Sequence, residues 1–180
     1  DGVKATSIRA LELLKSRGLQ LIMLSGDRQQ TVDQIAHSVK IDQAFGDQLP
    51  ESKMQFVSNF QSASGAIGMI GDGINDAPAL AKANIGFAMG TMGSDTAIET
   101  ADVALMDDDL MKLPNFFNIA DQTMGIIRQN IIFALGIKAF FLCLAVTGHA
   151  YMWMAILADV GTSLLVVLNA LRLLNIREID

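Results

Sequence analysis

The sequence is poor in the residues that build disulfides and thiolate sites, because Cys143 is its only cysteine among 180 residues. No disulfide can form within the chain, and no cluster of several thiolates can be built from it alone. Cys143 lies inside an apolar stretch, so we interpret it as a packing residue rather than a ligand. Positive charge is also scarce in residues 1–124, which carry 9 lysines and arginines against 16 aspartates and glutamates. That acidic balance argues against nucleic acid as a partner.

Charge of either sign is nearly absent from two C-terminal stretches, residues 131–148 and 152–174, whose only charged residues are Lys138, Asp159 and Arg172. Each stretch is long enough to cross a hydrocarbon core of about 30 Å. Neither follows a basic N-terminal segment, so neither is a signal peptide. We therefore expect an antiparallel transmembrane hairpin in the lipid bilayer, with residues 149–151 as its turn.

Positive residues flank this hairpin on one side only, and they are Lys112, Arg128, Arg172 and Arg177. By the positive-inside rule the soluble part and both ends of the chain are expected to be cytoplasmic, in a multi-pass protein of the plasma membrane.

The N-terminal part alternates short apolar runs with helical patterns. Strands are expected over residues 19–24, 66–70, 85–88 and 103–105, and helices over residues 3–16, 30–39, 52–60 and 77–82. This alternation is typical of a doubly wound α/β domain with a mostly parallel sheet. The expected division is a soluble domain over 1–112, a connecting helix over 113–130, the hairpin over 131–175 and a tail over 176–180.

The run Gly71 to Leu80, GDGINDAPAL, sets two carboxylates and an amide on a glycine turn directly after an apolar strand. Asp72 and Asp76 supply the hard oxygen ligands that Mg²⁺ prefers, and glycine lets the backbone approach a ligand closely. The motif predicts a magnesium and phosphoryl site, although polar turns between strands would also contain such residues.

Other residues complete a phosphoryl-transfer constellation. Ser25 offers a hydroxyl, Lys53 a positive charge at a helix start, and Asn75 an amide donor. Ser25-Gly26-Asp27 follows a strand, as the magnesium motif does, so both loops are expected to face one pocket at the carboxyl ends of the strands. Taken alone, Ser-Gly-Asp is a common turn and Lys53 an ordinary surface lysine.

Residues 69–110, which include GDGINDAPAL and GSDTAIETADVALMDDDL, resemble the heavy-metal pumps among the P-type ATPases. Ser25-Gly26-Asp27 likewise resembles the Thr-Gly-Asp of the haloacid dehalogenase superfamily, to which their phosphorylation domain belongs. The resemblance implies catalytic roles for Ser25, Gly26, Asp27, Lys53 and Asn75, with Mg²⁺ on Asp72 and Asp76 and with ATP as a cofactor that a further domain binds.

The family's nucleophile is the aspartate of Asp-Lys-Thr-Gly-Thr, and this sequence does not occur in the chain. No aspartyl-phosphate can form without it. We therefore expect the chain to be a C-terminal part of a pump, to require the remainder of the pump as its partner, and to be inactive alone.

Two charged residues fall within the hairpin, where each costs at least a few kcal/mol. Counted from Ala150 at a rise of 1.5 Å per residue, Lys138 and Asp159 lie at depths of about 18 and 14 Å, which allows them to form an ion pair. The surrounding sequences resemble the last two helices of the zinc, cadmium and lead branch. That resemblance implies that Asp159 is a ligand of the transported ion, Zn²⁺ or Cd²⁺, with Lys138 as its counter-ion.

Alternatives remain at the sequence level. The two charges could form an ion pair that only locks the helices together. The whole chain could be a catalytically silent membrane-bound regulatory or binding module, or part of a copper-type pump, although Lys138 and Asp159 oppose the copper reading. His37, His149 and the acidic run 107–109 are interpreted as solvated residues, with the acidic run forming a turn and helix cap.

Overall fold

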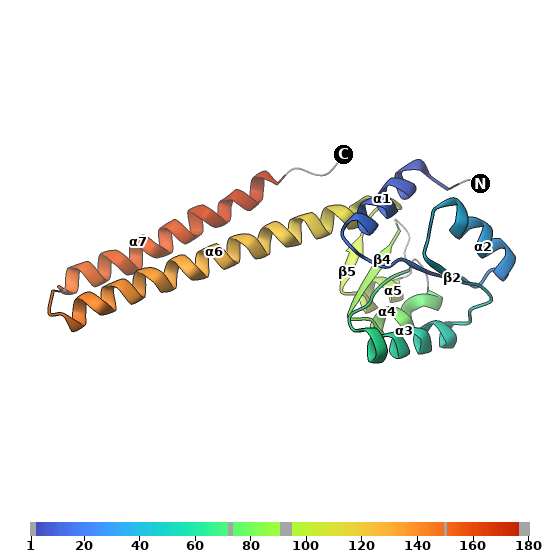
Figure 1. Cartoon of the computed structure of the whole chain (residues 1–180), viewed down its shortest axis with the longest axis horizontal. Coiled ribbons are helices and arrows are strands. Elements are labelled where there is room, and N and C mark those ends of the chain that lie inside the picture. The colour runs from blue at the N-terminus through green and yellow to red at the C-terminus, as the bar shows by residue number, and fades with distance from the viewer. Residues whose placement is uncertain (1–2, 72–73, 91–94, 150, 177–180) are drawn as a thin grey trace. The chain divides into compact units, whose positions relative to one another are not determined.

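The computed structural model describes residues 3–71, 74–90, 95–149 and 151–176 (Figure 1). The chain divides into two compact units, residues 1–112 and residues 113–180.

The first unit alternates helices and strands, as the sequence predicts (Figure 1). Its strands are β1 (Ile22–Leu24), β2 (Gln43–Phe45), β3 (Gly68–Gly71), β4 (Ile85–Met89) and β5 (Val103–Leu105). Its helices are α1 (Ala5–Ser16), α2 (Gln29–Ser38), α3 (Pro50–Ser64), the short 3-10 helix η1 (Ile74–Asp76), α4 (Ala77–Lys82) and α5 (Asp95–Thr100).

All ladders are parallel, which confirms the predicted α/β class. They form two sheets where one was expected: β1 pairs with β2, and β3, β4 and β5 pair in that order. Among the described residues no strand lies between β1 and β3. Each of these two strands therefore has one edge without a ladder partner in this part of the chain.

Strand β2 and helix α5 were not predicted, and the reasons are local. Strand β2 has only three residues, Gln-Ala-Phe, which form no apolar run. Helix α5 has six residues, too few for a periodic pattern. Conversely, the predicted strand over residues 19–24 is shorter in the structure, because β1 begins at Ile22.

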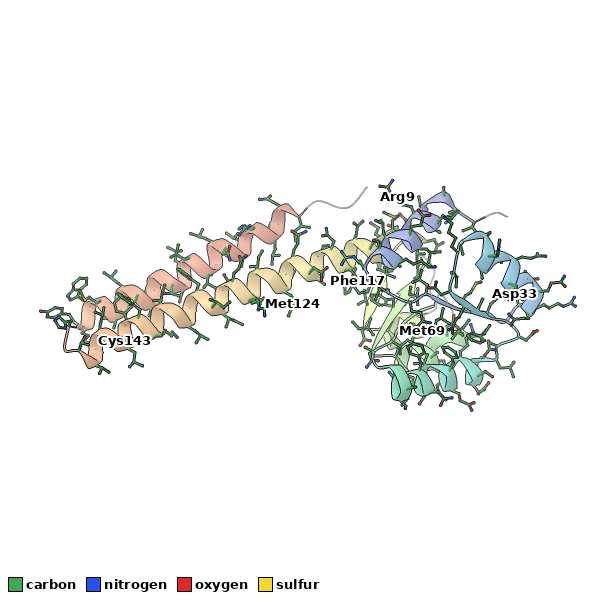
Figure 2. All side chains as sticks on the ribbon, in the orientation of Figure 1. Arg9, Asp33, Met69, Phe117, Met124 and Cys143 are labelled. Atoms are coloured by element: carbon green, nitrogen blue, oxygen red, sulfur yellow. The ribbon has the colours of Figure 1, made fainter. Side chains whose placement is uncertain are left out.

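The core of the first unit lies between helices and strands. Val32 on α2, Val57 on α3 and Leu80 on α4 are at most 1% exposed, and Phe87 on β4 is 2% exposed. Leu80 packs in a cluster with Ala88, with Met69 on β3 beside it (Figure 2). The motif after β3 is thus anchored to the core through α4.

Asp42, just before β2, ties three segments together. Its carboxylate accepts hydrogen bonds from Lys15 on α1, at 2.7 Å, and from the backbone N–H of Leu21, at 3.0 Å. The Lys15 hydrogen bond, followed by that of Leu21, lowers the pKa of Asp42 below its usual value. The interaction therefore stabilises the fold at neutral pH and is lost only as the pH falls through this lowered pKa.

The second unit contains two long helices that run antiparallel and side by side (Figure 1). Helix α6 (Lys112–Val146) has 35 residues, and α7 (Met152–Ala170) continues into the 3-10 helix η2 (Leu171–Asn175). Both are long and apolar enough to cross a membrane, judged by length and composition. The expected connecting helix and first span are one unbroken helix, because no proline lies between residues 115 and 146 to interrupt it.

Polar contacts join α6 to α7 at the end of the hairpin farthest from its turn. The amide of Asn169 donates to Asn130 Oδ1 at 2.8 Å, and the amide of Asn130 donates to the carbonyl of Val166 at 3.4 Å. Arg172 donates to Asn169 Oδ1 at 3.0 Å. Nearer the turn, Ala158 and Gly161 are half-buried and Thr162 is buried, with its hydroxyl donating to the carbonyl of Ala158.

Leu80→Ala should destabilise the first unit by about 2–5 kcal/mol, because it leaves a cavity in the core. Leu49→Ala removes the same atoms from a side chain that is 66% exposed, and should change stability by less than about 0.5 kcal/mol. Pulse proteolysis in urea of the detergent-solubilised chain measures both. Equal losses would contradict the core described here.

Candidate functional site

A largely buried ion pair joins two residues of the predicted site. Lys53 Nζ lies 2.7 Å from Asp76 Oδ1, and the two side chains are only 12% and 13% exposed. Lys53 is in the first turn of α3, which Pro50 starts, and its N–H donates to the carbonyl of Leu49 at 3.0 Å. Asp76 ends η1 and precedes α4. The structure therefore brings together two residues predicted from separate motifs.

Gly71, the last residue of β3, makes room for this carboxylate. A Cβ at Gly71 would lie 2.6 Å from Asp76 Cβ and 2.9 Å from Asp76 Oδ2, which is too close for real atoms. Any side chain at residue 71 would therefore displace Asp76 and its contact with Lys53. The first glycine of the motif is a steric requirement of the site.

Ser25, Gly26 and Asp27 follow the carboxyl end of β1. Ser25 Oγ donates to Asp27 Oδ2 at 3.1 Å, and the N–H of Asp27 donates back to Ser25 Oγ at 3.2 Å. Ser25 is half-buried, while Gly26 and Asp27 are exposed. A Cβ at Gly26 would meet its nearest atom, the carbonyl oxygen of Gln48, at an ordinary 3.6 Å, so sterics alone do not require this glycine.

Among the described residues no hydrogen bond or ion pair joins Ser25 or Asp27 to Lys53 or Asp76. What links the two groups is the backbone, because the N–H of Gln48 donates to the carbonyl of Ser25 at 2.9 Å, shortly before α3 begins. Sequence patterns do not predict this link, because they do not predict β2. The Gly46-Asp47 dipeptide, a turn signal after a short run, was the available clue.

Of the two remaining motif residues, the structure describes Asn75 but not Asp72. Asn75 lies in η1 with an exposed side chain, and Asp72 falls outside the described residues. The described part of the chain contains no group of three or more potential metal ligands. The donor that it does contain, the Asp76 carboxylate, is an oxygen ligand of the kind that Mg²⁺ takes.

Lys138 on α6 and Asp159 on α7 are both exposed. The ion pair that their depths allow is not formed, and neither charged group makes a hydrogen bond or ion pair among the described residues. The reason is the rotation of the helices: the half-buried positions of α6 include residues 134, 137 and 141, and those of α7 include Ala158 and Gly161. Both charges lie beside the shared face rather than in it.

The acidic run after β5 acts as a helix cap, as expected. Asp109 Oδ1 accepts a hydrogen bond from the N–H of Met111 at 3.0 Å, and Asp107 lies 3.7 Å from Lys112. Asp109 thus precedes the start of α6 as an ordinary capping residue.

The chain is similar to known proteins along nearly its whole length. A model of haloacid dehalogenase-like hydrolases matches residues 1–84. Over 99% of its length the chain is 45% identical to a probable cadmium-transporting ATPase of Listeria monocytogenes, of which it covers 25%. Over 96% of its length it is 42% identical to a zinc-transporting ATPase of Synechocystis sp., of which it covers 24%. The chain thus spans about a quarter of the length of these curated relatives.

A solved structure of a related pump resembles this chain in fold as well as in sequence. The crystal structure of a zinc-transporting PIB-type ATPase in the E2.Pi state superimposes with a TM-score of 0.90 at 40% identity. The match covers 97% of this chain and 28% of that one. It therefore includes the two long helices as well as the α/β unit.

The Lys53–Asp76 pair should show strong energetic coupling because it is largely shielded from water. A double-mutant cycle with Lys53→Met and Asp76→Asn should give a coupling free energy of about 1–3 kcal/mol. The matched cycle uses Lys40→Met and Glu12→Gln, whose ion pair is 3.4 Å long and whose side chains are 76% and 57% exposed. That exposed pair should give less than about 0.5 kcal/mol.

Urea unfolding of the four variants in each cycle measures both couplings. Equal coupling in the two cycles would show that the Lys53–Asp76 contact is solvated, contrary to the structure.

Proposed function

We propose that this chain, which belongs to the heavy-metal-transporting P-type ATPases, supplies the magnesium-holding half of an aspartyl-phosphate site in an ATP-driven export pump. The transported ion is Zn²⁺, Cd²⁺ or Pb²⁺, and the chain also supplies part of its transmembrane site. The observation that carries the proposal is the largely buried Lys53–Asp76 pair, for which the absence of a side chain at Gly71 leaves room.

Residues of the first unit have different roles in phosphoryl transfer. Ser25 and Asn75 donate hydrogen bonds to phosphoryl oxygens, with Gly26 and Asp27 shaping the first loop. Lys53 holds the Asp76 carboxylate in place and adds positive charge beside the phosphoryl group. Asp72 and Asp76 would hold Mg²⁺, which, when bound, neutralises charge on the transferred group. These roles are those of positioning and electrostatics, which dominate this class of reaction.

The attacking aspartate comes from outside this sequence. Strands β1 and β3 each have an edge without a partner among the described residues, and each leads into one of the site loops. A parallel strand inserted between them would complete a single doubly wound sheet, and its carboxyl end would lie at the same edge as both loops. We place the nucleophile at the end of that strand.

The two units have different locations in this proposal. Residues 1–112 form the C-terminal part of a cytoplasmic phosphorylation domain, residues 113–130 a connecting segment, residues 131–175 the transmembrane hairpin and residues 176–180 a cytoplasmic tail. Arg128 and Arg172 mark the cytoplasmic end of the hairpin. The pump resides in the plasma membrane.

Asp159 is proposed as a ligand of the transported ion and Lys138 as its built-in counter-ion. Both side chains are exposed on the isolated hairpin. A charged group at this depth needs a covering of protein or water, so this side of the hairpin faces further helices of the pump. Lys138 can neutralise the Asp159 carboxylate when the ion has left.

The chain by itself should hydrolyse no ATP, because it has no nucleophile, and it should bind Mg²⁺ weakly. In an NMR titration, Mg²⁺ should shift the backbone signals of residues 74–77, and Asp76→Asn should remove the shift. Hydrolysis above the blank by the purified chain would show that the nucleophile lies within it.

Asp159→Ala in the whole pump should lower zinc-stimulated ATP hydrolysis to the unstimulated level, because a ligand of the ion is lost. Phosphorylation by inorganic phosphate should persist, since the soluble site is untouched, and it confirms that the variant folds. Cys143→Ala is the control on α6 and should keep full stimulation. Wild-type stimulation in Asp159→Ala would overturn the assignment, and absence of stimulation in the wild type would favour a silent binding module.

A further inference from the structure

Backbone hydrogen bonds join the loop that contains Ser25 to residues 45–48, at the end of β2 and just after it. The N–H of Ser25 donates to the carbonyl of Phe45 at 3.0 Å, and the N–H of Gln48 donates to the carbonyl of Ser25 at 2.9 Å. The N–H of Asp47 donates to the carbonyl of Asp27 at 2.7 Å. The two ends of the loop are therefore both held by residues 45–48.

Gln29, the first residue of α2, fastens the same segment through its side chain. Its amide oxygen accepts the N–H of Gly46, and its amide nitrogen donates to the carbonyl of Ala44 at 3.1 Å and to Asp33 Oδ1 at 2.7 Å. Asp33 lies one turn further along α2 (Figure 2). Because residues 44 and 46 present these groups on one edge of β2, the amide takes the place that another strand would occupy there.

Two backbone features show that residues 46 and 47 pack tightly against Gln29 and Asp27. A Cβ at Gly46 would lie 2.5 Å from Gln29 Cα and 2.8 Å from the carbonyl oxygen of Asp27, so a side chain there would push the loop itself. Asp47 has a φ of +53°, in the left-handed region that aspartate and asparagine tolerate better than most residues. Its carboxylate accepts the N–H of Gln29 at 3.2 Å and so caps α2.

We propose that Gln29, Gly46 and Asp47 form a clamp that positions Ser25 for contact with the phosphoryl group and couples its placement to that of Lys53. The coupling runs through Gln48 into the start of α3, where Lys53 lies. The inference rests on the proposed function, since it assigns Ser25 to the phosphoryl group. The clamp residues are positioning residues, because they contact the loop rather than the reacting atoms.

The test uses the full-length pump with Gln29→Leu and, separately, Asp47→Ala. Both side chains are exposed, so both variants should fold. Loosening the loop should lower kcat about tenfold and raise the inhibition constant of orthovanadate, an analogue of the phosphoryl group in transfer, by a similar factor. The KM for ATP should stay within about twofold, because the clamp supports a contact made to the transferred phosphoryl group only.

Matched controls remove equivalent interactions elsewhere. Gln61→Leu deletes an amide on α3 that donates to the carbonyl of Lys82 at 2.8 Å and to Asn84 Oδ1 at 3.1 Å. Asp109→Ala deletes a capping carboxylate. Both should leave the vanadate constant unchanged. Asp47→Asn should restore activity, because asparagine keeps both an acceptor oxygen and a tolerance for positive φ.

The outcomes distinguish a failure of the clamp from a failure of the proposed function. Equal effects of Gln29→Leu and Gln61→Leu, or wild-type vanadate binding in both clamp variants, would overturn the clamp. If Ser25→Ala still loses activity in that case, the proposed function stands. If the wild-type pump shows no metal-stimulated hydrolysis, the proposed function itself is wrong.

Discussion

The contact between Lys53 and Asp76 determines how the first unit, residues 1–112, arranges the polar groups of its candidate site. It joins the start of α3 to the turn after β3, two segments 23 residues apart, with a 2.7 Å interaction that water hardly reaches. Desolvating both charges is costly, and removing either partner would leave the other buried without compensation. Such a pair is weak evidence for stability as such. It is better explained as fixing the direction of one carboxylate at the end of a strand.

The residue types of GDGINDAPAL are those that a magnesium and phosphoryl site requires, and this is why the sequence singles out Asp76 before its contact with Lys53 is known. The sequence does not predict the contact between Lys53 and Asp76. Lys53 alone has the pattern of an ordinary surface lysine, and the contact depends on the space that Gly71 leaves for Asp76. The support of the Ser25 loop was missed for a related reason. Strand β2, Gln-Ala-Phe, forms no apolar run, unlike the equally short β5, and the contacts of Gln29 with Ala44 and Gly46 depend on β2.

The hairpin shows a different limit of sequence reasoning. Rise per residue gives the depth of Lys138 and Asp159 in a membrane, but it does not give the direction in which each helix faces. Lys138 lies one residue beyond the half-buried Ile137, and one residue is a rotation of about 100° on a helix of 3.6 residues per turn. Depth therefore made an ion pair plausible, whereas helix rotation decides against a direct contact within this hairpin.

Charge balance gives a physical reason for a cation at the proposed phosphoryl site. The loops assigned to this site carry three carboxylates, Asp27, Asp47 and Asp76, against two cations, Arg28 and Lys53, and Lys53 is paired with Asp76. A phosphoryl group approaching these carboxylates would be repelled, and the unit as a whole is acidic. The fold therefore supplies geometry rather than a net attraction for phosphate. A divalent cation held by carboxylate oxygens reverses the sign of the local field, so the acidic residues that oppose phosphate binding are also those that make it possible.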